Sequence, residues 1–90
     1  MKAMKLLMRP IDAIVVFRGS GKPLPYKFRY TENDGTSREV YVGKILTAKE
    51  ERFAGIPVYV YDCQSEVKGS ERRYQLKYFI PECRWELYKM

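Results

Sequence analysis

The cations and aromatic residues between positions 26 and 42 alternate in a way that could bind nucleic acid. Lys27, Arg29 and Tyr41 fall on one side of two expected strands. Cationic side chains neutralise phosphates and aromatic rings stack on unpaired bases, which is how many β-sheets hold single strands. Further cations lie in the segments expected to flank this face: Arg18, Lys22, Lys68, Arg72 and Arg73. Together these residues form the candidate nucleic-acid site.

Catalytic and metal chemistry find little support in the sequence. The chain has no histidine, which is the commonest general base and metal ligand. Its two cysteines are too few for a zinc site, and no serine has a histidine to activate it. The segment Gly19-Ser20-Gly21-Lys22 resembles part of a phosphate-binding loop, but Pro23 follows it and the Walker spacing is missing. We therefore expect no enzymatic activity, no cofactor and no metal.

The turn at Asn33-Asp34-Gly35 decides which side chains of this region meet solvent. A bare two-residue turn would place Lys27 and Arg29 on an apolar face. A three-residue loop with Gly35 in the left-handed region shifts the pairing by one residue and gives one clean apolar face. We therefore predict the second register, with the pairs Tyr26–Val42, Lys27–Tyr41, Phe28–Val40 and Arg29–Glu39.

The remaining elements are read from apolar runs and turn residues. Thr47-Ala-Lys-Glu50 matches a capping box, Gly55 suits the position after a helix, and Pro57 stops one, so a short helix is expected over Ala48–Ala54. Strands are expected over residues 11–17, 26–31, 36–46, 58–64, 72–79 and 84–88. The first is nearly all apolar, as in a strand that is buried on both faces or closes a barrel.

These elements predict an all-β fold. Six antiparallel strands in sequence order favour a meander curled into a small barrel or half-barrel, OB-like or SH3-like, with the short helix between strands three and four. Residues 10–90 form a single domain, and residues 1–9 are expected to be a short flexible leader.

Pairing among the last three strands is less fully determined. A hairpin turn at Lys68-Gly69 aligns Tyr59, Tyr61 and Cys63 with Tyr78, Leu76 and Tyr74, whereas a one-residue bulge would bring Val58 and Val60 onto that face. Both faces are apolar, so both registers stay open. The turn before Arg84 pairs Trp85 with Tyr78 and Leu87 with Leu76. Cys63 and Cys83 then lie roughly 20 Å apart, too far for a disulfide, so we predict two free thiols.

Charge and composition widen the range of partners. The 90 residues include 17 Lys and Arg against 11 Asp and Glu, a net charge of +6 that attracts nucleic acid, anionic membranes or acidic proteins. The apolar run in Met1–Met8 is broken by Lys5 and too short for a signal peptide, and no stretch approaches the roughly 20 apolar residues of a membrane span. We expect a cytoplasmic protein without membrane contact.

Several short motifs carry a resemblance to a family of small proteins. They are Pro10-Ile11-Asp12, Phe28-Arg29-Tyr30, Ala54-Gly55, Cys63-Gln64-Ser65, Gly69 and the terminal segment from Cys83 to Tyr88. With these motifs the chain resembles a family of small uncharacterised bacterial β-rich proteins that has no assigned activity. It is more weakly similar to small β proteins encoded beside translesion DNA polymerase genes, which would imply a DNA-related accessory role. Neither resemblance implies a site residue.

Two functions follow from the sequence. The first is non-catalytic binding of single-stranded or structured nucleic acid through phosphate contacts and base stacking. The alternative is a protein-interaction or accessory domain that docks on a protein partner, for example through an exposed strand edge. Phosphate contacts would make binding strongly dependent on salt, whereas an apolar interface would not.

Overall fold

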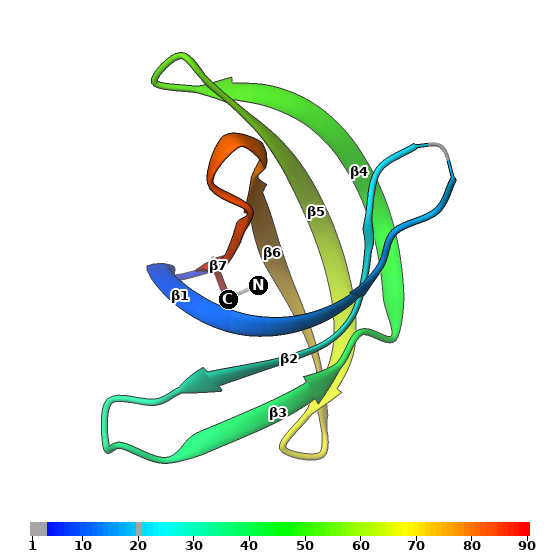
Figure 1. The fold of residues 1–90 in the computed structure, drawn as a ribbon. Helices are drawn as coiled ribbons and strands as arrows, with labels where there is room; N and C mark the ends of the chain where they lie inside the picture. Colours follow the sequence, from blue (N-terminus) through cyan, green and yellow to red (C-terminus); the bar gives the residue numbers. More distant parts are fainter. Residues whose placement is uncertain (1–3, 20) are drawn as a thin grey trace.

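The strands form one antiparallel sheet that curls into a half-barrel (Figure 1). The computed structural model describes residues 4–19 and 21–90, so Met1–Ala3 and Ser20 lie outside the described residues. The elements are β1 (Leu6–Val16), β2 (Leu24–Thr31), β3 (Ser37–Tyr41), β4 (Lys44–Phe53), β5 (Ile56–Val67), β6 (Ser70–Phe79), a single 3-10 turn η1 (Ile80–Glu82) and β7 (Arg84–Lys89). Hydrogen-bonded neighbours follow the order β3-β2-β1-β7-β6-β5-β4. The predicted all-β class and antiparallel half-barrel are confirmed, but the meander is not continuous, because β3 and β4 do not pair and β1 pairs with β7.

The segment predicted as a helix is a strand. β4 pairs along its length with β5, so the described residues hold seven strands rather than six, and no helix lies between β3 and β4. Thr47, expected to cap the helix, donates its hydroxyl to the Asp62 carboxylate across the ladder at 2.7 Å. Ala54 and Gly55 both have positive φ and form a two-residue turn that leads into β5. Continuous cross-strand pairing therefore overrides the local helix signals.

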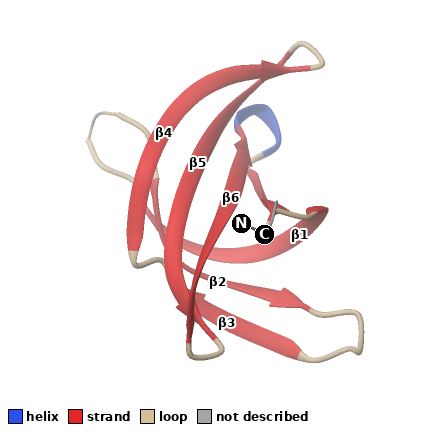
Figure 2. Ribbon diagram, turned by 180° about the vertical axis from the view of Figure 1, so that it is seen from behind, coloured by secondary structure: helices blue, strands red, loops and turns tan. Residues whose placement is uncertain are grey.

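A sharp bend at Val42-Gly43 joins the two strands at the ends of the sheet order, β3 and β4 (Figure 2). The Gly43 amide donates to the Ser65 hydroxyl at 2.9 Å. A Cβ at Gly43 would lie 3.0 Å from the Gln64 carbonyl oxygen, closer than side-chain carbons normally approach. Glycine thus lets the chain pass close to β5, and the sheet curls around its core.

The hairpin of β2 and β3 has the predicted register. Lys27 pairs with Tyr41, Phe28 with Val40 and Arg29 with Glu39, and Gly35 has a φ of 88°. Tyr26 differs from the prediction because its side chain is exposed instead of joining the apolar face. The β1–β2 register shifts at this point: Ile14 pairs with Lys27, but Val15 pairs with Pro25. Tyr26 is the extra residue of a β-bulge, which turns its side chain outward.

β1 is longer than predicted and starts inside the expected leader. Leu6 pairs with Lys89 of β7, and Lys5 and Met90 exchange backbone hydrogen bonds. Side chains along β1 alternate between half-buried and exposed, so this strand is not buried on both faces. Residues 6–9 of the expected leader are therefore part of β1.

The core lies inside the curl and is rich in aromatic residues. The Lys68-Gly69 hairpin is the register observed, with Tyr59 opposite Tyr78, Tyr61 opposite Leu76 and Cys63 opposite Tyr74. The predicted pairs Trp85–Tyr78 and Leu87–Leu76 are also present. Cys63 is buried and Cys83 exposed, and both are free thiols, as predicted. A second small cluster on the other face of the sheet contains Val58, Val60 and Phe79.

Candidate binding face on strands β1 to β3

One sheet face brings together the residues singled out in the hairpin. Lys27 and Arg29 of β2 point outward between Ile14 and Asp12 of β1 and Tyr41 and Glu39 of β3, forming two cross-strand rows. One row is Ile14, Lys27 and Tyr41, and the other is Asp12, Arg29 and Glu39. We call this surface, together with Val16 and Tyr26, the outer face. It places Lys27, Arg29 and Tyr41 side by side.

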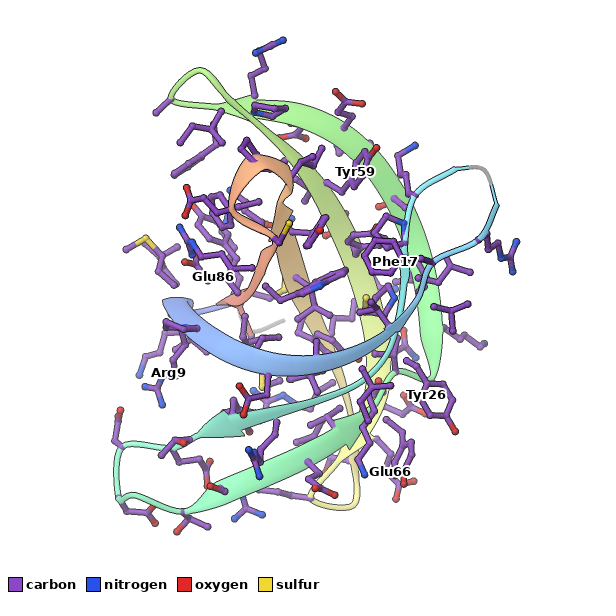
Figure 3. The ribbon with its side chains drawn as sticks, in the orientation of Figure 1. Arg9, Phe17, Tyr26, Tyr59, Glu66 and Glu86 are labelled. Atoms are coloured by element: carbon purple, nitrogen blue, oxygen red, sulfur yellow. The ribbon has the colours of Figure 1, made fainter. Side chains whose placement is uncertain are left out.

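Apolar side chains make up much of the outer face. Ile14, Val16, Tyr26 and Tyr41 are each between 51% and 59% exposed, which is high for large apolar residues. The rings of Tyr26 and Tyr41 meet edge to face with centroids 5.8 Å apart, and Tyr26 points away from the half-barrel in Figure 3. Several exposed apolar side chains gathered on one face, with charged residues among them, are typical of an interaction site.

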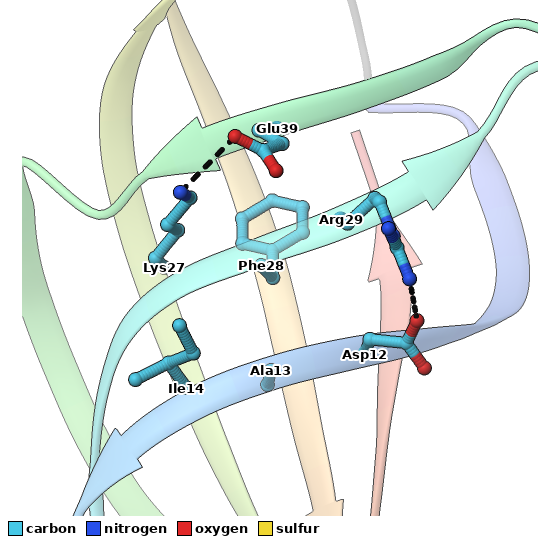
Figure 4. Close-up of a pocket in the computed structure, with 7 residues that line it drawn as sticks. All are labelled: Asp12, Ala13, Ile14, Lys27, Phe28, Arg29 and Glu39. Atoms are coloured by element: carbon cyan, nitrogen blue, oxygen red, sulfur yellow. Dashed lines mark hydrogen bonds and ion pairs between the residues drawn. The ribbon is translucent and has the colours of Figure 1, made fainter.

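Both cations of the outer face are neutralised by neighbouring carboxylates (Figure 4). Lys27 Nζ lies 3.0 Å from Glu39 Oε1 and 4.8 Å from the centroid of the Tyr41 ring. The Arg29 guanidinium lies 2.7 Å from Asp12 Oδ2. The hydrogen bond to Glu39 raises the pKa of Lys27, and the hydrogen bond to Asp12 raises the pKa of Arg29. The two ion pairs leave this part of the surface without net charge.

A shallow hollow of about 250 Å³ lies between the two ion pairs. Its lining consists of Asp12, Ala13, Ile14, Lys27, Phe28, Arg29 and Glu39. This volume is below the roughly 300–1,000 Å³ of most small-molecule sites. It suits one protruding side chain better than a whole ligand.

A second hollow of about 490 Å³ opens where β1 and β2 separate, beyond the Asp12–Arg29 ion pair. If the β1–β2 register continued, Pro10 would face Thr31, but proline has no N–H for the Thr31 carbonyl. The Arg9 guanidinium donates to that carbonyl instead, and also to Asn33 Oδ1 at 2.6 Å. Arg9 therefore connects the two strands where the backbone ladder stops.

The other predicted nucleic-acid residues lie away from the outer face. Arg18 and Lys22 belong to the segment between β1 and β2, and Lys22 Nζ lies 5.5 Å from the centroid of the Tyr59 ring. Lys68, in the turn between β5 and β6, forms an ion pair with Glu32 at 2.9 Å. Arg72 and Arg73 are exposed on β6. Only Lys27, Arg29 and Tyr41 are therefore neighbours on one face.

Sequence reasoning missed the apolar half of this surface and one of its acids. Asp12, Ile14 and Val16 have the same parity along β1, and the charged member marks that side as solvent-facing. This alternation could have identified Ile14 and Val16 as exposed. The bulge that exposes Tyr26 has a weaker signal, namely Pro25 within the strand.

The described part of the chain contains neither a cluster of metal-binding side chains nor a membrane-spanning helix. Residues 4–19 and 21–90 contain no group of three or more Cys, Asp or Glu side chains placed to hold a metal ion. Within the same residues, no helix is long and apolar enough to span a membrane.

Comparison with protein-family models finds no match to this chain, and comparisons with curated proteins and with solved structures find none either. Function is therefore inferred from the side chains and the strand arrangement themselves.

Proposed function

We propose that this protein is a non-catalytic interaction module that docks on another protein through the outer face. The observation that carries the proposal is the group of four exposed apolar side chains, Ile14, Val16, Tyr26 and Tyr41, on one side of β1 to β3. Large apolar side chains gathered on one exposed face often mark an interaction site, and aromatic residues are enriched at protein interfaces.

Charge on this face favours a protein partner over a polyanion. Lys27 and Arg29 already have carboxylate partners, so a phosphate would have to displace Glu39 or Asp12. Removing one partner of an ion pair that becomes covered leaves an uncompensated charge, which costs binding energy. The matching partner surface is therefore apolar at its centre and carries little net charge.

The small hollow between the two ion pairs indicates which kind of partner side chain the outer face can accept. Ile14 is the exposed apolar side chain of its lining, between the two ion pairs, so an apolar side chain can enter with charged groups at its rim. Interface energy is usually concentrated in a few such anchors in small pockets, surrounded by polar contacts that exclude water.

Site-specific photo-crosslinking tests the proposal. The photo-reactive amino acid benzoylphenylalanine replaces Tyr41 on the outer face in one sample and the exposed Glu71 on β6 in a matched control. A protein captured only through position 41 is identified, purified, and titrated against wild type, Ile14→Glu and Glu71→Ala. We expect Ile14→Glu to weaken binding at least about tenfold, Glu71→Ala to leave it unchanged, and salt to have little effect. Equal capture at both positions, or equal binding by both variants, would overturn the proposal.

Nucleic-acid binding is the second candidate, and the unpaired arginines favour it. Among residues 4–19 and 21–90, no carboxylate lies within 4.0 Å of the Arg18, Arg72 or Arg73 guanidinium. With the net charge of +6, these groups are available to phosphates. Fluorescence anisotropy with labelled single-stranded DNA, single-stranded RNA and duplex DNA tests this at low and physiological salt.

The salt response separates the two candidates. Binding that persists at physiological salt and prefers one polymer supports the nucleic-acid candidate, and loss of that binding in Lys27→Ala/Arg29→Ala assigns it to the outer face. Binding that disappears with salt and does not distinguish the polymers reflects only a cationic protein near polyanions, and it rejects this candidate.

A further inference from the structure

β4 forms an open edge of the sheet. Among the described residues its only hydrogen-bonded neighbour is β5, and it is the last strand in the sheet order (Figures 1 and 2). The side chains from Leu46 to Phe53 are all exposed. Natural edge strands are commonly protected by proline, bulges or charged side chains, and β4 carries four consecutive charged residues, 49–52. The single irregularity of β4 lies between Ile45 and Thr47, so Thr47–Phe53 is an uninterrupted edge without proline.

The turn after β4 determines which backbone groups face outward. Ala54 and Gly55, with φ of 52° and 82°, form a two-residue hairpin turn. The residues flanking such a turn, Phe53 and Ile56, exchange both backbone hydrogen bonds. Counting back from Phe53 by twos, Glu51, Lys49 and Thr47 also direct their N–H and C=O toward β5.

The alternate residues direct their backbone groups to the open edge. These are Ala48, Glu50 and Arg52, which pair with Tyr61, Tyr59 and Pro57 without hydrogen bonds to them. An added strand can therefore form hydrogen bonds to β4 only in registers that place its own free N–H and C=O groups opposite Ala48, Glu50 and Arg52.

We propose that a second copy of this chain adds its β4 to this edge in antiparallel orientation, with Glu50 of one copy facing Glu50 of the other. Ala48 then pairs with Arg52 of the second copy, so every outward N–H and C=O of the three residues is bonded. In the same register, Lys49 faces Glu51 of the second copy, and the twofold symmetry repeats this pair. The dimer is one continuous sheet across the two half-barrels.

Backbone bonding selects this register over its two neighbours. A slip of the partner by two residues one way places Lys49 opposite Lys49 of the second copy, which opposes like charges, and Arg52 opposite Leu46, which lies at the irregularity of β4. A slip the other way places Glu51 opposite Glu51 but Glu50 opposite Arg52, so it has as many opposite-charge pairs as the proposed register. In that slip Ala48 faces Ala54 of the turn, and fewer outward groups are bonded.

Electrostatic repulsion in the proposed register is small. Lys49 and Glu51 already form an ion pair within one chain at 3.5 Å, with both side chains exposed, and such pairs contribute little. Glu50 faces its own copy, but Arg52 of the second copy lies at the diagonal position, within reach of a long side chain. The opposing carboxylates are therefore compensated by guanidinium groups.

Charge reversal tests the register directly. Sedimentation equilibrium and light scattering over a wide concentration range measure dimerisation of wild type, Lys49→Glu and Lys49→Glu/Glu51→Lys. We expect Lys49→Glu to weaken the dimer by about tenfold or more, since both intermolecular pairs become repulsive. The double variant restores opposite charges and should recover wild-type affinity. A wild type that stays monomeric throughout, or a double variant no better than the single one, overturns the proposal.

Two proline variants separate effects on dimerisation from effects on the folding of the monomer. Glu50→Pro removes an N–H that points away from β5, so it should abolish dimerisation while the unfolding midpoint stays near that of Lys49→Glu. Glu51→Pro removes an N–H that bonds β5 and should destabilise the monomer itself. If both prolines destabilise the monomer equally, the assignment of outward groups is wrong.

Crosslinking locates the twofold axis. In a Cys83→Ser background, Glu50→Cys places two thiols at a hydrogen-bonded pair, where Cα atoms lie about 5.5 Å apart and a disulfide can form. Mild oxidation should yield a covalent dimer, and Thr47→Cys, which faces Phe53 of the second copy, should not. Equal crosslinking of both variants contradicts the register.

Discussion

At the fork, the place where β1 and β2 separate, Arg9 should hold the two strands together. Pro10 cannot do so because it has no N–H to donate to β2. The Arg9 guanidinium donates to the Thr31 carbonyl and to Asn33 Oδ1, both across more than twenty residues of sequence. In Arg9→Met the aliphatic stem remains, but both hydrogen bonds are lost. Hydrogen bonds to charged groups are worth about 1.5–3 kcal/mol each when shielded, and this site is exposed, so we expect a total loss of about 1–2 kcal/mol.

A second substitution tests the reason for this loss. Pro10→Ala supplies an N–H opposite the Thr31 carbonyl, where the register of β1 and β2 would place it. In wild type that carbonyl is already occupied, so Pro10→Ala should only lower stability by about 0.4–1 kcal/mol through the more flexible unfolded chain. In Arg9→Met the new N–H has a free acceptor, so we expect a favourable coupling of about 1 kcal/mol between the two sites.

Urea denaturation of the four proteins measures this cycle. Each kcal/mol should also appear as a shift of about 4–8 °C in Tm for a chain of this size. Arg18→Met serves as the control because Arg18 is exposed and hydrogen-bonds to no described residue, so its replacement should change stability by less than about 0.5 kcal/mol. Additive effects of Arg9→Met and Pro10→Ala, or an Arg9→Met loss no larger than that of the control, would refute this account of the fork.

Three further predictions concern titration and a buried polar contact. Hydrogen bonds from Lys68 and Arg38 lower the pKa of Glu32, so its ion pairs should stabilise the fold above about pH 4.5 and lose this effect as pH falls; the stability difference between wild type and Glu32→Gln should shrink on acidification in urea melts. Burial raises the pKa of the Cys63 thiol to about 12, so a thiol reagent at pH 8 should modify Cys83 alone until the protein is unfolded. Ser65→Ala leaves both the buried Tyr74 hydroxyl and the Gly43 amide without their partner and should cost about 1–3 kcal/mol, whereas a cost below about 0.5 kcal/mol would mean that water replaces these bonds.

Where side-chain alternation and a turn agreed, the sequence was sufficient to predict pairing. The β2–β3 register follows from an apolar face that includes Phe28 and Val40 and from the glycine that the loop requires. The same holds for β6 and β7, where Trp85 and Leu87 must share a face. In the β2–β3 hairpin a slip of one residue would also place Lys27 and Arg29 on the apolar face, so the alternative register is much less stable.

The charge state of the outer face could not be predicted in the same way. Arg29 was expected to face Glu39, and it does, but its ion pair is with Asp12 on β1, and Glu39 pairs instead with Lys27. That outcome depends on the β1–β2 register, which is set by a bulge at Tyr26 and by long-range packing. The net charge of a sheet face therefore cannot be predicted from the cations of one strand, because the neighbouring strands supply the carboxylates that pair with them.

β4 shows most clearly why local signals failed, and the failure bears on its role. The residues from Thr47 to Arg52 favour a helix in isolation, yet they form a strand whose backbone is bonded by β5 and by no other described strand. Local preference and tertiary pairing thus oppose each other here, which makes this edge less stable than a central strand. A second strand that bonded Ala48, Glu50 and Arg52 would shift the balance further toward the extended form. Edge pairing with a second copy would therefore stabilise the conformation that the isolated sequence least favours.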